Sequence, residues 1–279
     1  MGRQRDNVFI KYYSLIHMKG LAGKIAIVTA ASSGIGKGIA KVLVSEGCSV
    51  YISSRDENKL RKSAEDIKKE TGKDVSTIPC DLSKPDDVKL MLNEVKKKVG
   101  KVDFLIINYG DPRVAPFLDI TDDDWDSSIN MFIKSTVYMT KSVLPDMIAR
   151  EYGRVVFITS LTTKQPLENF AISASLRAAV VSLSKVLSIE YAQKGITFNS
   201  ISQGYIMTPR LENIARRNAE KSNISVEQAY EAIKQTIPAK RFGTPEEIGN
   251  LVSFLCSSDA SYINGTNIQI DGGFVKFPF

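Results

Sequence analysis

The sequence predicts an α/β protein built on a doubly wound, mainly parallel sheet of seven strands with helices on both faces. Apolar runs of strand length alternate with amphipathic helical patterns along the chain. These runs are almost continuously apolar, which is typical of strands that are covered on both faces. No internal repeat or low-complexity linker interrupts the alternation. It therefore favours right-handed β-α-β crossovers within one domain.

The individual elements follow from local patterns. Strands are expected at residues 24–30, 49–53, 75–79, 103–107, 154–159, 196–202 and 267–271. The helices between them carry apolar stripes, as at 35–46, where Ile35, Ile39 and Leu43 share one face. Residues 209–238, rich in Arg, Glu, Lys and Asn, interrupt the rhythm and are expected to form a helical flap.

The N-terminal segment stands apart from this pattern. Residues 1–20 are expected to form an extension, and residues 21–279 a single domain. The extension weakly resembles a targeting peptide, and a start codon assigned too early, with Met18 as the biological start, is an open alternative. The only histidine, His17, lies in this segment, so zinc chemistry built on histidine is excluded and no metal site is expected.

Composition narrows the function classes. The net charge of +6 is spread along helices, so a nucleic-acid partner is not expected. No apolar run approaches the length needed to cross a bilayer, so no membrane association is expected. The three cysteines have no paired spacing, which fits a reducing compartment and predicts a cytoplasmic protein.

The end of the first strand carries a glycine-containing turn, Thr29-Ala30-Ala31-Ser32-Ser33-Gly34-Ile35-Gly36, that runs into a helix. Glycines allow backbone amides to approach a pyrophosphate, and the helix N-terminus attracts its negative charge. A turn in this position predicts a dinucleotide-binding site. Its expected cofactor contacts are Thr29, Ser32, Ser33, Gly34, Ile35 and Gly36.

The spacing of this turn resembles the T-G-x-x-x-G-x-G motif of the short-chain dehydrogenase/reductase family, with Ala30 where that family usually has glycine. The resemblance extends from Leu21 to near the C-terminus, and the chain is similar to 3-oxoacyl-carrier-protein reductases and glucose dehydrogenases. Two further motifs carry it, Cys80-Asp81-Leu82 and Asn108-Tyr109-Gly110, together with residues 237–273. The resemblance implies a Rossmann-type domain in which Asp81, Leu82, Asn108 and Gly110 contact the cofactor.

The end of the second strand bears on the choice of cofactor. An acidic residue there would accept the ribose hydroxyls of NAD, but this chain has Ser54 and Arg55. Arg55 offers planar donors that suit a 2′-phosphate, and Ser54 removes the repelling carboxylate. NADP (NADPH) is therefore expected in preference to NAD. The alternative is that Arg55 merely pairs with Asp56 or Glu57 at the surface.

The resemblance implies a catalytic Asn, Ser, Tyr and Lys, and three of these four are replaced. Ser160 matches the family serine, but Ser173 stands at the tyrosine position and Arg177 at the lysine position. The asparagine position holds Phe132. Beyond the sixth strand, Gly204, Ile206 and Thr208 remain as expected contacts of the nicotinamide end.

These replacements leave two hypotheses. An aliphatic hydroxyl is a far weaker acid than a phenol. Arg177 is expected to contact the cofactor by holding its ribose oxygens, but arginine cannot shuttle a proton. In the first hypothesis the chain remains an NADP(H)-dependent oxidoreductase of a carbonyl or alcohol substrate, with a non-standard proton path. Ser160 then polarises the carbonyl and Arg177 stabilises the developing oxyanion, while Tyr109 and Tyr205 are candidate replacement donors. In the second it is a catalytically inactive NADP(H)-binding sensor or oligomer partner.

The substrate and partners are less defined. An apolar pocket is expected from flap and helix residues: Leu211, Ile214, Ala215, Ile224, Phe132 and Phe170. The basic flap residues Arg210, Arg216, Arg217 and Lys221 could receive an acidic carrier or a carboxylated substrate, or form a solvated face. The resemblance also implies a homodimer or homotetramer, paired through helices around 124–150 and 170–193.

Overall fold

The sheet at the centre of the protein has all of the predicted strands. The computed structural model describes residues 18–277. Its seven strands pair in parallel in the order β3-β2-β1-β4-β5-β6-β7. Their bounds are β1 Ile25–Val28, β2 Ser49–Ser54, β3 Ser76–Pro79, β4 Phe104–Ile107, β5 Gly153–Ile158, β6 Ile196–Gln203 and β7 Asn267–Ile270. The predicted Rossmann-type, doubly wound sheet is confirmed. The predicted extension lies almost wholly outside the described residues.

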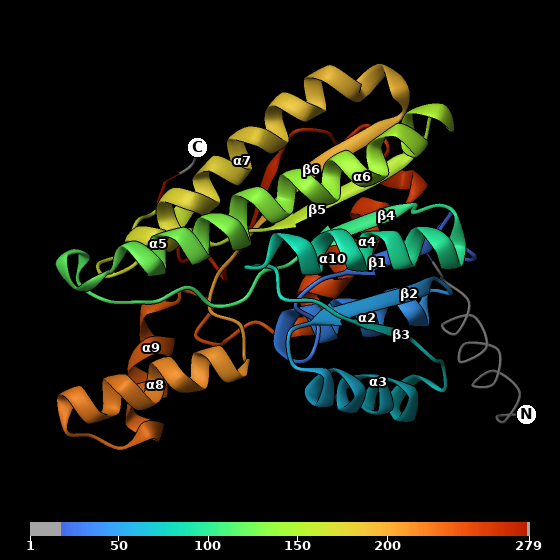
Figure 1. Ribbon diagram of the computed structural model, residues 1–279. Coiled ribbons are helices and arrows are strands. Elements are labelled where there is room, and N and C mark those ends of the chain that lie inside the picture. The colour runs from blue at the N-terminus through green and yellow to red at the C-terminus, as the bar shows by residue number, and fades with distance from the viewer. Residues whose placement is uncertain (1–17, 278–279) are drawn as a thin grey trace, which may run out of the picture.

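Helices cover both faces of the sheet (Figure 1). On one face lie α2 (Gly34–Ser45), α3 (Glu57–Thr71) and α10 (Pro245–Cys256). On the other face lie α4 (Pro85–Val99), α6 (Ser135–Ala149) and α7 (Ala171–Tyr191). Alternate strand residues feed the two layers: in β4, Phe104 and Ile106 belong to the first core, and Leu105 and Ile107 to the second. Both faces are apolar because both are covered.

The helix expected around 124–150 has an irregular segment in its middle. It consists of α5 (Asp122–Ile129), a π-helical turn (Asn130–Lys134) and then α6. Thr121 starts it with a capping box, in which its side chain accepts from the amide of Asp124. The π-helical turn carries Phe132 and turns it into the core.

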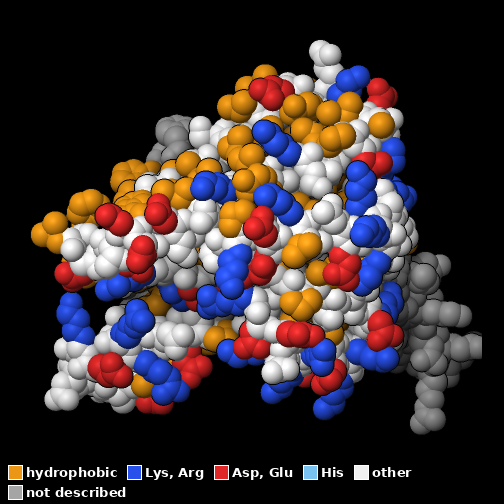
Figure 2. Space-filling model, in the orientation of Figure 1, with side chains coloured by type: hydrophobic (Ala, Val, Ile, Leu, Met, Phe, Trp, Pro, Cys, Tyr) orange, Lys and Arg blue, Asp and Glu red, His pale blue; other side chains and the backbone are white. Residues whose placement is uncertain are grey.

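The helix α7 corrects one sequence-based expectation. Residues Ala171–Lys194 are long and apolar enough to cross a bilayer by length and composition, although no such segment was expected. In the fold, α7 packs one side on the sheet through residues such as Ile172 and Val180. Its other side leaves Val186 and Ile189 exposed. Figure 2 shows apolar side chains gathered over α5, α6 and α7.

The predicted flap is a pair of helices, α8 (Pro209–Ser222) and α9 (Val226–Thr236). Thr208 caps α8 by accepting from the amide of Leu211, and Pro209 takes the first helical position. The two helices enclose a small core of their own that includes Leu211, Ala215 and Ile233. In Figure 1 the flap lies beside the sheet and covers neither of its faces.

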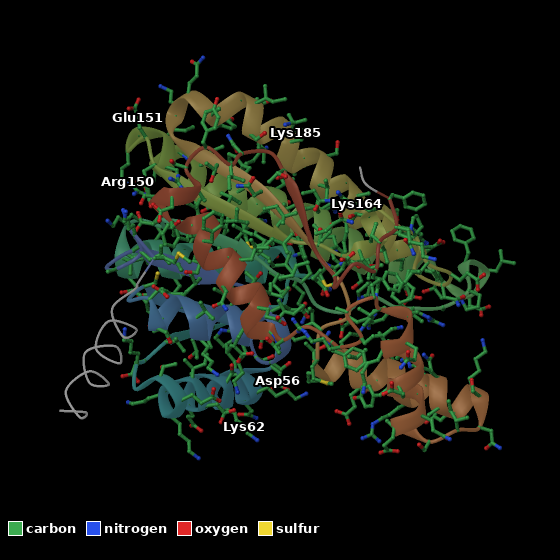
Figure 3. The ribbon with its side chains drawn as sticks, turned by 180° about the vertical axis from the view of Figure 1, so that it is seen from behind. Asp56, Lys62, Arg150, Glu151, Lys164 and Lys185 are labelled. Atoms are coloured by element: carbon green, nitrogen blue, oxygen red, sulfur yellow. The ribbon has the colours of Figure 1, made fainter. Side chains whose placement is uncertain are left out.

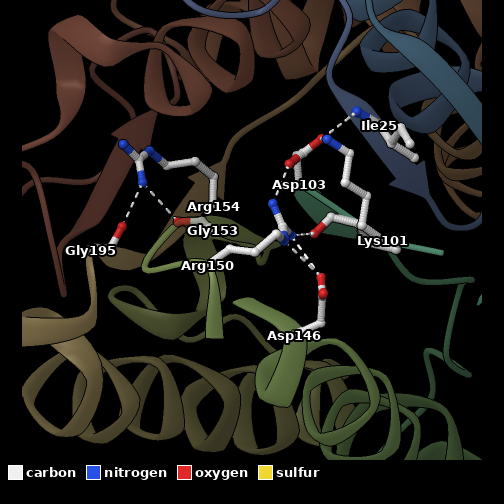
Figure 4. A network of polar contacts seen from close by, with 9 residues as sticks. Ile25, Lys101, Asp103, Asp146, Arg150, Gly153, Arg154 and Gly195 are labelled. Carbon is white, nitrogen blue, oxygen red and sulfur yellow. Dashed lines mark hydrogen bonds and ion pairs between the residues drawn. The ribbon is translucent and has the colours of Figure 1, made fainter. Parts of the chain in front are cut away.

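A buried carboxylate ties the N-terminal ends of β1 and β4 to α6 (Figure 4). Asp103 is fully buried and accepts hydrogen bonds from the Ile25 amide at 2.9 Å and from Arg150 Nη1 at 2.8 Å. Arg150 also donates to Asp146 and to the Val102 carbonyl. Because the Asp103 charge is paired and hydrogen-bonded, its burial is compatible with a stable fold. Figure 3 shows Arg150 and Glu151 at the end of the sheet opposite Lys164.

Candidate active site

A cleft of about 500 Å³ runs along the C-terminal ends of the strands. It extends from the ends of β2 and β3, past the turn after β1, to the ends of β5 and β6 and the flap. The strand order changes direction between β1 and β4, and such a change is where doubly wound sheets bind ligands. Figure 2 shows the surface hollowed between the flap and the helices above it.

The turn after β1 lets the start of α2 pack closely against the backbone of Ala30 and Ala31. At Gly36 a Cβ atom would lie 2.4 Å from the carbonyl oxygen of Ala30 and 2.8 Å from the Cα of Ala31, so no other residue fits without moving the backbone. Gly34 has φ +54, and Ser32, Ser33, Gly34 and Ile35 line the cleft. The start of α2 is thereby brought to the cleft wall, where its amides suit an anion.

Ala30 explains why glycine is usual at its position. It adopts φ +48, in the left-handed region that disfavours residues with a Cβ. A neighbouring hydrogen bond keeps Ala30 in this conformation, because the Ala30 carbonyl accepts from Asn108 Nδ2 at 3.1 Å. The substitution therefore leaves the turn in shape and places a local strain in it.

Thr29 and Asn108 join the ends of β1 and β4. The Thr29 hydroxyl donates to the Asn108 carbonyl at 2.6 Å and accepts from the Asn108 amide at 3.0 Å. Thr29 is fully buried and does not line the cleft, whereas Asn108 does. Thr29 and Gly36, both predicted as cofactor contacts, thus shape the cleft wall from behind.

The end of the cleft beside β2 and β3 holds the residues predicted to select the cofactor. Ser54, Arg55, Asp81 and Leu82 all line it, with Asp56. The side chain of Asp56 caps α3 by accepting from the Lys59 amide at 3.0 Å. Figure 3 shows Asp56 at the end of α3 that faces the flap. Arg55 forms no ion pair with Asp56 or Glu57 within residues 18–277, so its charge is available to a ligand.

Lys59 is a cleft residue that the sequence analysis missed. It lies in the first turn of α3, and its ammonium nitrogen is 3.6 Å from a carboxylate oxygen of Asp56. The signal that reveals it is its place in the first turn of the helix that follows β2, at the edge of the sheet where doubly wound folds bind nucleotides.

The opposite end of the cleft holds Ser160, Ser173 and Arg177, as the sequence predicted. Ser160 follows β5, and its side-chain oxygen accepts from the Thr162 amide at 3.2 Å, which leaves its O–H free to donate. Ser173 and Arg177 lie one turn apart on α7 and are 5% and 7% exposed. The hydroxyl of Ser173 makes no hydrogen bond within residues 18–277. Gly204, Ile206, Thr208 and Gly110 also line this end.

Arg177 lies against two aromatic rings. Its guanidinium carbon is 4.8 Å from the ring centroid of Phe132 and 5.6 Å from that of Tyr109. The two rings are 4.8 Å apart between centroids. Arg177 Nη1 donates to the Ile158 carbonyl at 2.9 Å, and Nε is buried without a partner. Burial lowers the pKa of Arg177 to about 10, so it remains a cation at neutral pH.

Both tyrosines proposed as replacement proton donors, Tyr109 and Tyr205, have a phenol whose pKa is raised. Tyr109 lines the cleft, but its hydroxyl lies 2.7 Å from that of Thr136 within the core. Burial raises the pKa of Tyr109 well above its usual range, and burial also raises the pKa of Tyr205. The Tyr205 ring packs against Phe274 at the cleft edge. Both tyrosines therefore act first as packing aromatics.

The expected apolar pocket is only partly correct. Leu211, Ile214 and Phe170 line the cleft. Phe132 is fully buried behind Tyr109, Ala215 faces the core of the flap, and Ile224 is exposed; none of the three lines it. Of the basic flap residues, only Arg210 lines the cleft. The sequence analysis also missed Asp111, Met131, Leu161, Thr162, Leu167 and Asn213.

Comparison with known proteins adds an independent line of evidence. Residues 29–275 match the family model described as Enoyl-(Acyl carrier protein) reductase. Oxidoreductase UcpA of Escherichia coli (strain K12) is 37% identical over 257 residues, which cover 92% of this chain and 96% of that protein. Dehydrogenase/reductase SDR family member 4 of Homo sapiens is 33% identical over 254 residues, 91% of this chain and 88% of the relative.

Solved structures are similar over nearly the whole chain. L-sorbose reductase from Gluconobacter frateurii, complexed with NADPH and L-sorbose, superposes with a TM-score of 0.87 at 29% identity, covering 94% of this chain and 100% of that one. A variant of actinorhodin polyketide ketoreductase with NADPH gives 0.87 at 28% identity, covering 93% of this chain and 100% of that one.

Proposed function

Because the chain belongs to the short-chain dehydrogenase/reductase family, we propose that it is an NADP(H)-dependent oxidoreductase that interconverts a carbonyl compound and an alcohol by a non-standard proton path. One observation carries the proposal: a single cleft joins the glycine turn and Arg55 to Ser160 and Arg177. A dinucleotide laid along it brings its reactive end to the two groups that can bind a carbonyl oxygen.

The residues fit the cofactor. Only glycine is accommodated at Gly36, and the α2 N-terminus beside it suits a pyrophosphate. Arg55 and Lys59 face the other end of the cleft, where two cations favour a 2′-phosphate. The solved relatives L-sorbose reductase and actinorhodin polyketide ketoreductase were crystallised with NADPH, which supports the same choice.

The chemistry divides between cofactor and protein. Reduction of a carbonyl needs a hydride at carbon, which bound NADPH supplies, and a proton at oxygen. The Ser160 O–H is free to donate to the carbonyl oxygen, and Arg177 is a fixed cation that stabilises negative charge as it develops there. The proton comes from solvent water, and the Ser160 hydroxyl relays it, taking a proton from water as it gives one to the carbonyl oxygen. Neither Ser160 nor Ser173 is acidic enough to replace a phenol as the proton source. The reverse reaction returns it by the same route.

Single-turnover oxidation of NADPH against a panel of aldehydes, ketones and sugars tests this function. The expected result is slow, measurable oxidation by the wild type that falls at least tenfold in Ser160→Ala, with NADPH affinity unchanged. Tight NADPH binding without oxidation of any substrate would overturn the proposal.

That second outcome would support the alternative function, an NADP(H)-binding sensor or inactive oligomer partner. One observation favours this alternative: the Tyr109 hydroxyl is turned into the core toward Thr136, so the cleft keeps few acid–base groups near Ser160. The two candidates differ in turnover but share the cofactor, so the same experiment separates them.

We also propose that the protein is a homo-oligomer paired through α7. Small or apolar residues form one exposed stripe along this helix: Ser175, Ala178, Ala179, Ser182, Val186 and Ile189. Small side chains let two helices approach closely, and burial of Val186 and Ile189 would stabilise the contact. Sedimentation of wild type and Ala179→Arg tests it. A shift from dimer or tetramer to monomer is expected, and a wild-type monomer would contradict the proposal.

A further inference from the structure

The strongest unexplained feature of the cleft is the buried charge of Arg177. Within residues 18–277 no carboxylate forms an ion pair with it, and only Nη1 of its guanidinium donates a hydrogen bond. A buried cation without an anionic partner is costly to a fold. The rings of Tyr109 and Phe132 offset part of this cost by cation–π contacts but supply no charge.

Other polar groups on the same wall are also unpartnered. The hydroxyl of Thr162, a residue that is 2% exposed, is buried without a hydrogen bond in the described part of the chain. The Ser173 hydroxyl, one turn before Arg177 on α7, also makes no hydrogen bond among the described residues. Both residues line the cleft with Arg177. Two buried donors without partners therefore lie at this end of the cleft, and an oxyanion is the acceptor that would satisfy them best, because hydrogen bonds to a charged acceptor are the strong ones.

The charges nearby do not neutralise Arg177. Arg210 and Asp111 line the same end of the cleft and form an ion pair at 3.4 Å. Their charges cancel to a first approximation, which leaves the charge of Arg177. A nicotinamide ribose offers only neutral hydroxyls to a cation, so a bound cofactor would not remove the imbalance.

We propose that the substrate is an oxo acid, a carbonyl compound with a carboxylate on the adjacent carbon, and that Arg177 binds the carboxylate together with the carbonyl oxygen. The planar guanidinium presents parallel N–H groups, and in a 2-oxo acid the two acceptor oxygens lie side by side. The inference rests on the proposed function and specifies its substrate class. Arg177 then determines specificity in addition to stabilising charge.

Two matched pairs of probes test the inference. Calorimetry measures the binding of benzoate and of benzamide to the NADP⁺-saturated protein. The two ligands compare a carboxylate with a neutral group of the same shape. Benzoate is expected to bind at least tenfold more tightly, and Arg177→Met should abolish the difference. Arg177→Lys keeps the charge and should retain part of it. Arg216→Met is the control, because Arg216 is an exposed flap residue paired with Glu212.

Turnover provides the second pair. The KM for phenylglyoxylate should be at least tenfold below the KM for its methyl ester. Arg177→Met should raise the KM for phenylglyoxylate and leave the KM for the ester unchanged. Equal binding of benzoate and benzamide, or discrimination that survives Arg177→Met, would overturn the inference while reduction of the ester still upheld the proposed function. If the protein binds benzoate more tightly than benzamide but reduces neither the acid nor the ester, the anion site would be supported and the proposed function would be overturned.

Discussion

The guanidinium carbon of Arg177 lies 4.8 Å from the ring centroid of Phe132, and the same ring packs at a tilt against Tyr109. The positions that carry lysine and asparagine in related enzymes, as the sequence resemblance implies, thus contact each other here as a cation and an aromatic ring. Replacement of one without the other would leave either a buried charge without its ring or a cavity. The two changes are therefore coupled, and their effects on activity and stability should not be additive.

Charge at the β2 end of the cleft should determine the cofactor. Arg55→Asp is expected to weaken NADPH binding at least tenfold and to leave NADH binding nearly unchanged, because a charged hydrogen bond to phosphate contributes about 1.5–3 kcal/mol. Titration of both cofactors by nicotinamide fluorescence measures it. Arg61→Asp is the matched control, since Arg61 is exposed on α3, the helix that follows Arg55, and pairs with Glu57. Equal affinities of the wild type for NADPH and NADH would show that Arg55 does not select the cofactor.

The strain at Ala30 predicts a stabilising substitution. Ala30→Gly should raise the free energy of unfolding by about 1 kcal/mol, because glycine adopts the positive φ of this residue without the penalty of a Cβ. Urea unfolding of the two proteins measures the difference. A clear loss of stability would mean that the alanine methyl group contributes packing that outweighs the strain.

The buried carboxylate of Asp103 predicts a large loss of stability. Asp103→Ala is expected to lower the free energy of unfolding by about 3–5 kcal/mol, since Arg150 and the Ile25 amide lose their buried acceptor. Asp146→Ala is the control, because Asp146 pairs with Arg150 at the surface and should cost less than about 1 kcal/mol. Similar losses in both variants would contradict the role given to Asp103.

The charge of Arg177 also predicts the pH dependence. Its pKa of about 10 lies below the unfolded value, so the unfolded chain binds more protons between the two values. The cost of burying this cation is therefore present below pH 10 and fades above it. Turnover should be flat from about pH 6 to 9 and fall above about pH 10, where the cation is lost. An ionisation between pH 6 and 9 that Tyr205→Phe removes would instead identify a relocated proton donor.

Most of the fold could be predicted because it follows from local patterns. All seven strands and the flap appear where the apolar runs and the composition place them. The expectation that no apolar run approaches spanning length was wrong for α7, because residues Ala171–Lys194 reach that length in a helix that packs one side on the sheet. Length and composition alone do not distinguish such a helix from a spanning one.

The site could be predicted where a motif fixes the position of a residue. Ser160, Ser173 and Arg177 lie together in the cleft as expected. Burial and side-chain direction could not be predicted, so Phe132 was placed in the pocket but lies behind it. Lys59, Thr162 and Asp111 were missed because no motif marks them and only the folded chain brings them to the cleft.

Ser173 does not serve as the acid in the carbonyl reduction proposed for this protein. Single-turnover oxidation of NADPH by wild type, Ser173→Ala and the triple variant Phe132→Asn, Ser173→Tyr, Arg177→Lys tests it most directly. We expect slow oxidation by the wild type, a Ser173→Ala rate within about threefold of it, and oxidation at least tenfold faster by the triple variant, while the single changes gain little. Fast oxidation by the wild type that is lost in Ser173→Ala would show that Ser173 is the acid after all.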